Sequence, residues 1–339
     1  MNAQELQATA RAMVAPGKGI LAADESAGTV AQRLASVGIA STEETRRAYR
    51  DLLLTTPGIE QFISGVILVD ETIRQKALNG TAFPALLAAK GIIAGIKVDK
   101  GAVDLAGLPG EKVTEGLDGL RGRLAEYRTM GARFAKWRAV ITIGDGIPSR
   151  ACLESNAHAL ARYAALCQEA GLVPIVEPEV LLDGAHDIAR CAAATWEAQR
   201  LTFAALVEHR VMLEGVVLKP NMVLSGKSCP QQAGATEVAE ATVRVLRQAV
   251  PAAVPGIAFL SGGQGPVEAT VRLNAINRVG PQPWELTFSF ARALQEPPLQ
   301  AWKGNAAQVP VAQKLFYHRA RCNAVARAGK YSPQMEETA

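Results

Sequence analysis

The stretch Gly215-Val216-Val217-Leu218-Lys219-Pro220-Asn221 is a short apolar run that ends in a lysine beside a proline. The chain repeats this arrangement in Gly95-Ile96-Lys97-Val98-Asp99-Lys100 and in Phe134-Ala135-Lys136-Trp137-Arg138. If the three runs are parallel strands of one barrel, their lysines meet at the same mouth. Charge repulsion and partial desolvation at such a mouth lower lysine pKa values. The pattern therefore predicts a lysine that can form a Schiff base with a carbonyl compound.

Short apolar runs recur at wide intervals along the whole chain. They lie at 19–23, 65–69, 92–98, 134–140, 173–176, 216–218, 257–260 and 286–288. Longer stretches with helical periodicity separate them, for example 151–170 and 235–250. Strands that alternate with helices imply right-handed crossovers and a parallel sheet. The repeats predict an α/β fold, a single (β/α)8 TIM barrel over residues 1–339, with its site at the carboxyl ends of the strands.

The two ends of the chain are expected to add elements to this barrel. Residues 1–14 have an alanine-rich helical pattern, and residues 311–327 form an apolar helical face that would pack outside the barrel. The polar segment 330–339 has no periodic pattern and is predicted to be a mobile tail. The structural alternative is a doubly wound open sheet. That fold usually has a glycine-rich first βα turn, whereas Gly17-Lys18-Gly19 precedes its apolar run and lacks a third glycine.

Composition limits the classes of function. The 339 residues are 49% hydrophobic, which is enough for a large core in one domain. The 36 Lys and Arg residues against 32 Asp and Glu residues give a net charge of +4, without a basic run. We therefore expect small anionic substrates and no nucleic acid. The first 14 residues lack the apolar core of a signal peptide and no stretch suits a membrane span, so no membrane partner is expected.

The cysteines and histidines argue against disulfide and metal chemistry. The five cysteines are widely spaced, odd in number and without a CxxC pair, which is typical of a reduced cytoplasmic setting. The four histidines are scattered and form no ligand spacing that we recognise in the sequence. We therefore predict neither a metal ion nor another cofactor.

Acidic residues also follow the apolar runs. Glu177 and Glu179 are spaced by two after the run 173–176, so an extended backbone points both carboxylates to one side. Two neighbouring carboxylates do not both ionise cheaply, so one is expected to have a raised pKa and to serve as a proton donor. The plainer alternative is a pair of strand-end glutamates in solvent or paired with lysine. Asp24 follows the first run and is a candidate base, although turn aspartates are common.

A glycine turn follows the seventh run. Ser261, Gly262 and Gly263 lie where the backbone N–H groups of many barrels bind phosphate. Ser289 and Arg292 follow the eighth run and would add a hydroxyl and a guanidinium to the same corner. An ordinary turn explains the glycines about as well when they are considered alone.

These residues together resemble the class I fructose-bisphosphate aldolase family. The resemblance rests on APGKGILAADES at 15–26, GIKVDKG at 95–101, IVEPE at 175–179, LKPNM at 218–222 and FLSGGQ at 259–264. These motifs are long, occur in family order and cover nearly all of the chain to about Pro333. The resemblance implies a metal-independent lyase of glycolysis and gluconeogenesis that cleaves fructose 1,6-bisphosphate into dihydroxyacetone phosphate and glyceraldehyde 3-phosphate. It also implies a homotetramer.

The resemblance assigns a role to each catalytic candidate. Lys219 attacks the C2 carbonyl of the open-chain ketose, and Glu177 supplies the acid that dehydrates the carbinolamine. The iminium then acts as an electron sink while Asp24 takes the proton of the C4 hydroxyl, and Lys136 with Glu179 holds the charge network. The expected contacts to the C1 phosphate are Ser261, Gly262, Gly263, Ser289, Arg292 and Arg33, those toward the C6 phosphate are Ser26, Thr29 and Lys97, and Arg138 is a further phosphate or hydroxyl contact.

Three positions depart from the family pattern. Phe290-Ala291 stands where many members have a tyrosine and then a glycine, and alanine is restricted if that glycine is left-handed. Gln32 stands where many animal members have a lysine. The terminal tyrosine of many animal enzymes is absent, since Tyr331 belongs to an earlier segment. Two other functions therefore stay open at this point: a transaldolase-like Schiff-base enzyme for a related ketose phosphate, and a silent sugar-phosphate-binding scaffold.

Overall fold

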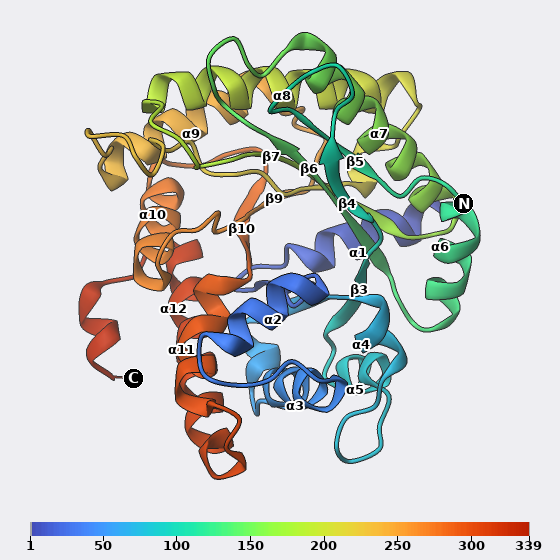
Figure 1. Ribbon diagram of the computed structural model, residues 1–339, viewed down its shortest axis with the longest axis vertical. Coiled ribbons are helices and arrows are strands. Elements are labelled where there is room, and N and C mark those ends of the chain that lie inside the picture. The colour runs from blue at the N-terminus through green and yellow to red at the C-terminus, as the bar shows by residue number, and fades with distance from the viewer. Residues whose placement is uncertain (1, 339) are drawn as a thin grey trace.

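The computed structural model describes residues 2–338, and Met1 and Ala339, the outermost residues of the predicted helix and tail, lie outside this part. Parallel strands close into a barrel in the order β1-β10-β9-β8-β7-β6-β3-β2 (Figure 1). These strands are β1 Gly19–Ala22, β2 Ile63–Leu68, β3 Ile93–Lys97, β6 Phe134–Ile141, β7 Val173–Val180, β8 Val217–Leu218, β9 Gly256–Phe259 and β10 Glu285–Phe290. The predicted TIM barrel is confirmed, and each predicted run overlaps one of its strands.

Helices surround the barrel (Figure 1). They are α1 Ala3–Met13, α2 Ala27–Ala35, α3 Glu43–Leu54, α4 Asp70–Arg74, α5 Phe83–Ala89, α6 Leu120–Thr129, α7 Arg150–Glu169, α8 Ile188–Glu208, α9 Ala235–Ala249, α10 Pro266–Arg278, α11 Arg292–Trp302 and α12 Val309–Arg327. Short 3-10 helices lie at Ile59–Gln61 (η1), Leu213–Gly215 (η2), Ala306–Gln308 (η3) and Pro333–Thr338 (η4). No helix within residues 2–338 combines the length and the apolar character that a membrane crossing requires.

One element of the fold is not apparent in the sequence. Strands β4, Gly101–Asp104, and β5, Lys112–Glu115, form an antiparallel hairpin between β3 and α6. Most of its residues are partly or fully exposed, so they show no apolar run from which a strand could be predicted.

The barrel is filled from its amino-terminal end by apolar side chains. Leu6, Ala10 and Met13 of α1 pack with Phe134 and other inward-facing strand residues in one buried cluster. Phe134 lies opposite Gly95 in the ladder between β6 and β3, and its ring fills the space where a side chain at position 95 would lie. Because α1 and this cluster close the floor, the barrel is open only at the carboxyl ends of its strands.

The C-terminal segment packs outside the barrel, as predicted. Helix α12 lies against α10 and α11, and η4 follows it on the outer side (Figure 1). Glu336 of η4 accepts hydrogen bonds from Arg319 at 2.6 Å and from the Tyr331 hydroxyl at 2.7 Å. The tail, which was predicted to be mobile, contains the 3-10 helix η4 and forms an ion pair with α12.

Candidate active site

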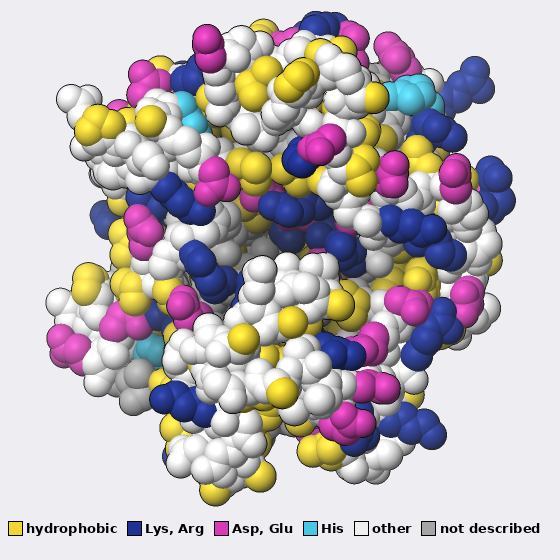
Figure 2. Space-filling view, in the orientation of Figure 1, with side chains coloured by type: hydrophobic (Ala, Val, Ile, Leu, Met, Phe, Trp, Pro, Cys, Tyr) yellow, Lys and Arg dark blue, Asp and Glu magenta, His cyan; other side chains and the backbone are white. Residues whose placement is uncertain are grey.

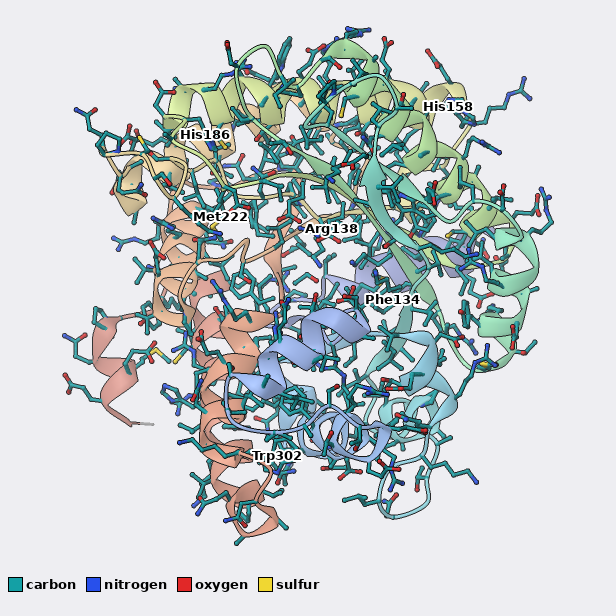
Figure 3. The ribbon with its side chains drawn as sticks, in the orientation of Figure 1. Phe134, Arg138, His158, His186, Met222 and Trp302 are labelled. Atoms are coloured by element: carbon teal, nitrogen blue, oxygen red, sulfur yellow. The ribbon has the colours of Figure 1, made fainter. Side chains whose placement is uncertain are left out.

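Side chains that point into the barrel change from apolar to charged toward the carboxyl ends of the strands. On β6, Phe134 at the floor is followed on the same face by Lys136 and Arg138, because strand side chains alternate with a period of two. Figure 3 labels Phe134 and Arg138, which lie toward the middle of the molecule. Glu177 and Glu179 follow the same rule on β7, which extends through both glutamates to Val180. The mouth is therefore lined by charge above an apolar floor.

The loop after β8 holds Lys219 in a fixed position. Its backbone N–H donates to the carbonyl of Val176 at 2.9 Å, which continues the pairing of β8 with β7. Asn221 reinforces this position, since its side-chain oxygen accepts the N–H of Val180 at 3.0 Å. As a result Lys219 projects from the end of β8 directly beside Glu177.

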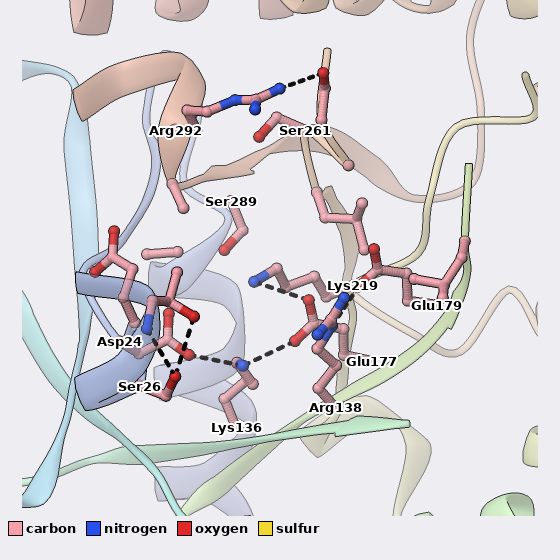
Figure 4. Close-up of a pocket in the computed structure, with 18 of the residues that line it drawn as sticks. Asp24, Ser26, Lys136, Arg138, Glu177, Glu179, Lys219, Ser261, Ser289 and Arg292 are labelled. Atoms are coloured by element: carbon pink, nitrogen blue, oxygen red, sulfur yellow. Dashed lines mark hydrogen bonds and ion pairs between the residues drawn. The ribbon is translucent and has the colours of Figure 1, made fainter. Parts of the chain in front are cut away.

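A chain of alternating charges crosses the mouth (Figure 4). The Lys136 ammonium lies 2.6 Å from Asp24 Oδ2 and 3.1 Å from Glu177 Oε2. Glu177 Oε1 lies 3.1 Å from the Lys219 ammonium. All four side chains are at least nine-tenths buried. Glu179 pairs with Arg138 and not with Lys136.

The pKa directions differ from those that the sequence predicted. Burial alone would raise the pKa of Glu177 and of Asp24, but Lys136 and Lys219 outweigh it and lower both pKa values. Burial alone would lower the pKa of Lys136, yet Asp24 and Glu177 raise it. A raised pKa is therefore wrong for Glu177, and the expected lowered pKa is wrong for Lys136. Opposite charges lie closer to each group than like charges do.

The glycine turn after β9 forms one corner of the mouth. Gly262 and Gly263 have φ angles of +52° and +89°, a left-handed backbone that glycine adopts without strain. Arg292, the first residue of α11, donates a hydrogen bond to the carbonyl of Gly263. The buried Ser289 hydroxyl has no hydrogen-bond partner among the described residues. This corner therefore offers a guanidinium and a free hydroxyl to an anion.

A second polar corner lies at the start of α2. The Ser26 hydroxyl caps this helix by accepting the N–H of Thr29 at 3.3 Å, and the two hydroxyls lie 3.0 Å apart. Lys97 contacts Asp99 at 3.1 Å and keeps its side chain partly exposed toward the cavity. Arg33 forms an ion pair with Glu25. The start of α2 beside Lys97 is a second place suited to a phosphate.

One cavity of about 390 Å³ joins the two corners, and every candidate site residue named from the sequence lines it. Figure 2 shows a hollow near the centre of the face, with lysine and arginine side chains gathered in it. Lys227 and Asp183 also line the cavity, and the sequence did not predict them. Both lie in irregular loops without periodicity, so no local signal marks them.

Comparison with known proteins identifies the family. The family model described as Fructose-bisphosphate aldolase class-I, in the glycolytic group, matches residues 5–339. The chain is 58% identical to the probable fructose-bisphosphate aldolase class 1 of Xanthomonas axonopodis pv. citri, over 98% of this chain and 99% of that one. It is 52% identical to the cytosolic fructose-bisphosphate aldolase 4 of Arabidopsis thaliana, over 96% of this chain and 84% of that one.

The chain belongs to the class I fructose-bisphosphate aldolases. A solved aldolase structure agrees, that of the Plasmodium falciparum enzyme in complex with TRAP and a small-molecule inhibitor. It superposes with a TM-score of 0.96 at 49% identity, over 97% of this chain and 95% of that one. As a class I aldolase the chain is a metal-independent lyase that cleaves fructose 1,6-bisphosphate reversibly.

The departures from the aldolase pattern can now be located. Ala291 has φ −103°, so its backbone is not left-handed and the alanine side chain is tolerated. Phe290 is fully buried and packs against Phe288, with ring centroids 5.6 Å apart. Gln32 lies on α2 and does not line the aldolase cavity. None of these changes removes a charged group from the mouth.

One group of potential metal ligands lies outside the aldolase cavity. His318 and Cys322 are one helical turn apart on α12, a spacing that we did not recognise in the sequence, and with Glu336 they place donor atoms within 4.8 Å of one another. However, Arg319 lies 2.6 Å from both carboxylate oxygens of Glu336. The arrangement is an ion-pair network that attaches the tail to α12.

Proposed function

We propose that Lys219 is the lysine that forms the Schiff base with the C2 carbonyl of the open-chain ketose. The observation that carries this assignment is that the two buried lysines, Lys136 and Lys219, form different numbers of ion pairs. Lys136 lies between two carboxylates, which keep it protonated, whereas the one ion pair of Lys219 within residues 2–338 is to Glu177. Glu177 can therefore accept the proton that Lys219 must lose before its amine attacks.

The same carboxyl group then serves the next step. Attack of the Lys219 amine on C2 gives a carbinolamine, and Glu177 returns the proton to its hydroxyl so that water leaves and an iminium forms. Asp24, ionised because Lys136 and Lys219 lower its pKa, takes the proton of the C4 hydroxyl. The C3–C4 bond breaks, its electrons pass to the iminium, and glyceraldehyde 3-phosphate leaves. Protonation of the enamine at C3 and hydrolysis then release dihydroxyacetone phosphate.

The two polar corners of the cavity suit the two phosphates. The C1 phosphate would bind at the corner nearest Lys219, formed by Ser261, Gly262, Gly263, Ser289 and Arg292. Arg33 was expected there too; it lines the same cavity and forms an ion pair with Glu25. The C6 phosphate would bind at the start of α2 with Ser26, Thr29 and Lys97. Arg138, held by Glu179, would contact a substrate hydroxyl between them.

Borohydride trapping tests the assignment of Lys219. The protein is incubated with fructose 1,6-bisphosphate in excess EDTA, triose phosphate release is followed, and a parallel sample is reduced and mapped by peptide mass spectrometry. We expect release with an adduct on Lys219, no adduct in Lys219→Met, and a retained adduct in Lys136→Arg. An adduct on Lys136 in the unaltered protein would overturn the assignment.

We also propose that the protein is a cytoplasmic homotetramer without nucleic-acid, membrane or cofactor partners. The family resemblance supports the tetramer, and the plant relatives that are named cytosolic support the location. Light scattering should give a mass about four times the 35.8 kDa of one chain. A monomer or dimer at micromolar concentration would contradict this assembly.

A further inference from the structure

Lys227 lies on a loop whose backbone is fixed against its neighbour. In the loop from β8 to α9, Gly226, Lys227 and Ser228 donate N–H groups to carbonyls of the loop from β7 to α8, at 2.8, 2.8 and 3.0 Å. A side chain at position 226 would lie 2.3 Å from the carbonyl oxygen of Gly184, so this close approach requires glycine. The Cα of Lys227 is therefore held at the rim of the cavity.

The side chain of Lys227, in contrast, is held weakly. Its ammonium lies 2.8 Å from Asp183, and the two side chains are 54% and 68% exposed. An ion pair this exposed contributes little to stability, because water and salt screen it. Lys227 can therefore leave Asp183 for a stronger anion without a large loss of stability.

The head group of Lys227 reaches the glycine turn. A Cβ built on Gly263 would lie 3.3 Å from the Lys227 ammonium and 3.6 Å from Nη2 of Arg292. A cation from the loop after β8 and a cation from the first turn of α11 thus flank one face of Gly263. The space between them is open because residue 263 has no side chain. Both cations line the cavity that also contains Lys219 and Ser289.

We infer that Lys227 binds the same phosphate group of the substrate as Arg292, and that Asp183 is a positioning residue that holds Lys227 at the rim while the cavity is empty. A phosphate dianion attracts the ammonium more strongly than a single carboxylate does, so binding exchanges one partner for the other. Gly263 carries no side chain that would block the exchange. The inference rests on the proposed function, since it takes this corner as the site of the C1 phosphate.

Steady-state kinetics with two ketoses tests the inference. Lys227→Met removes the charge and keeps most of the side-chain length. We expect the KM for fructose 1,6-bisphosphate and for fructose 1-phosphate to rise by the same factor, about five-fold, with kcat within about two-fold. Fructose 1-phosphate has only the C1 phosphate, so an equal effect on both substrates locates the contact. The effect should shrink in 0.5 M salt, because an exposed cation is screened.

Matched variants separate phosphate binding from a structural role. Lys227→Arg should keep the KM of the unaltered protein. Asp183→Asn should lower KM by about two-fold, because the phosphate no longer competes with the carboxylate. An unchanged KM in Lys227→Met, or a KM in Asp183→Asn that rises as much as in Lys227→Met, would overturn the inference, since the ion pair would then serve only to hold the loops.

A phosphate-binding measurement keeps this test separate from the proposed function. Inorganic phosphate is titrated calorimetrically into the unaltered protein and into Lys227→Met. We expect the variant to bind it about five-fold more weakly. Equal binding would overturn the inference even if the unaltered protein cleaves both ketoses. Absence of cleavage together with weaker phosphate binding in the variant would instead retain the inference and reject the proposed function.

Discussion

Lys136 forms ion pairs with two carboxylates, whereas Lys219 forms one within residues 2–338, and this difference supports our proposal that Lys219 forms the Schiff base. The pKa of Lys136 is raised because Asp24 and Glu177 outweigh its burial. A permanently charged Lys136 also lowers the pKa of Asp24 and of Glu177, so both carboxyl groups are ionised in the free protein. At the residue scale, the site therefore contains one lysine, Lys136, that its partners keep charged, and a second, Lys219, that we propose as the nucleophile.

Glu177→Gln should lower kcat for fructose 1,6-bisphosphate by about 100-fold or more, because an amide neither accepts the proton of Lys219 nor returns it. KM should change little, since Glu177 is assigned no phosphate contact. Stopped-flow cleavage assays and the rate of borohydride-trapped adduct formation measure both effects. Glu179→Gln is the matched control, because Glu179 pairs with Arg138, and it should lose less activity. A larger loss in the control would contradict the assignment.

Ala291→Gly tests whether the departure from the family glycine matters. Since φ at Ala291 is −103°, glycine offers no conformational advantage there. We expect KM within about two-fold of the unaltered protein and a loss of about 0.4–1 kcal/mol in the free energy of unfolding, because glycine has more freedom in the unfolded chain. Urea unfolding and steady-state assays give the two numbers. A several-fold lower KM would show that alanine impairs phosphate binding.

At the element scale, the loops after β7 and β8 form one unit at the rim. His186 (Figure 3) belongs to the loop after β7, and a Cβ at Gly226 in the loop after β8 would be 3.0 Å from its ring. Its ring nitrogens are buried without a hydrogen-bond partner among the described residues. Burial lowers the pKa of His186, Asp187 opposes this effect and Arg190 adds to it. The loops thus pack around a neutral imidazole.

This histidine should make stability depend on pH. Its unfolded-state pKa is about 6.5, and its folded-state pKa is lower. As pH falls below about 6.5 the unfolded chain binds the proton first, so the free energy of unfolding decreases with falling pH. Urea unfolding at pH 7.5 and 5.5 should show a smaller decrease in His186→Leu than in the unaltered protein. Between pH 7.5 and 8.5 the two should not differ in slope, and an equal acid decrease would contradict the prediction.

The tail should contribute to stability more than to turnover. Truncation after Gln334 removes Glu336 and leaves the buried Arg319 without its carboxylate partner. We expect a loss of about 1–3 kcal/mol in the free energy of unfolding and little change in kcat, because residues 330–338 do not line the cavity. Truncation after Glu336 is the control and should retain stability. A selective fall in kcat at unchanged stability would show that the tail acts at the active site.

For the molecule as a whole, the apolar side chains at the closed end of the barrel pack beneath the charged residues of the mouth. A Cβ at Gly95 would lie 2.2 Å from the ring of Phe134, so Gly95→Ala must displace that ring from the barrel interior. We expect a loss of about 1–3 kcal/mol in the free energy of unfolding, measured in urea. Gly122→Ala in α6 is the matched control, because nothing lies within 4 Å of the added methyl group. It should stabilise by about 0.5–1 kcal/mol, and a loss there would undermine the packing explanation.

The sequence by itself determined the barrel and the residues at its mouth. Alternating apolar runs and helical stretches are local patterns, and a strand period of two places Lys136 and Glu177 on inner faces without knowledge of the rest of the chain. Only the tertiary structure decided which charges pair. Glu179 pairs with Arg138, Lys136 has a raised pKa, and Lys227 meets Arg292 over Gly263. These outcomes depend on distances between residues far apart in the chain, which closure of the barrel sets and no local pattern encodes.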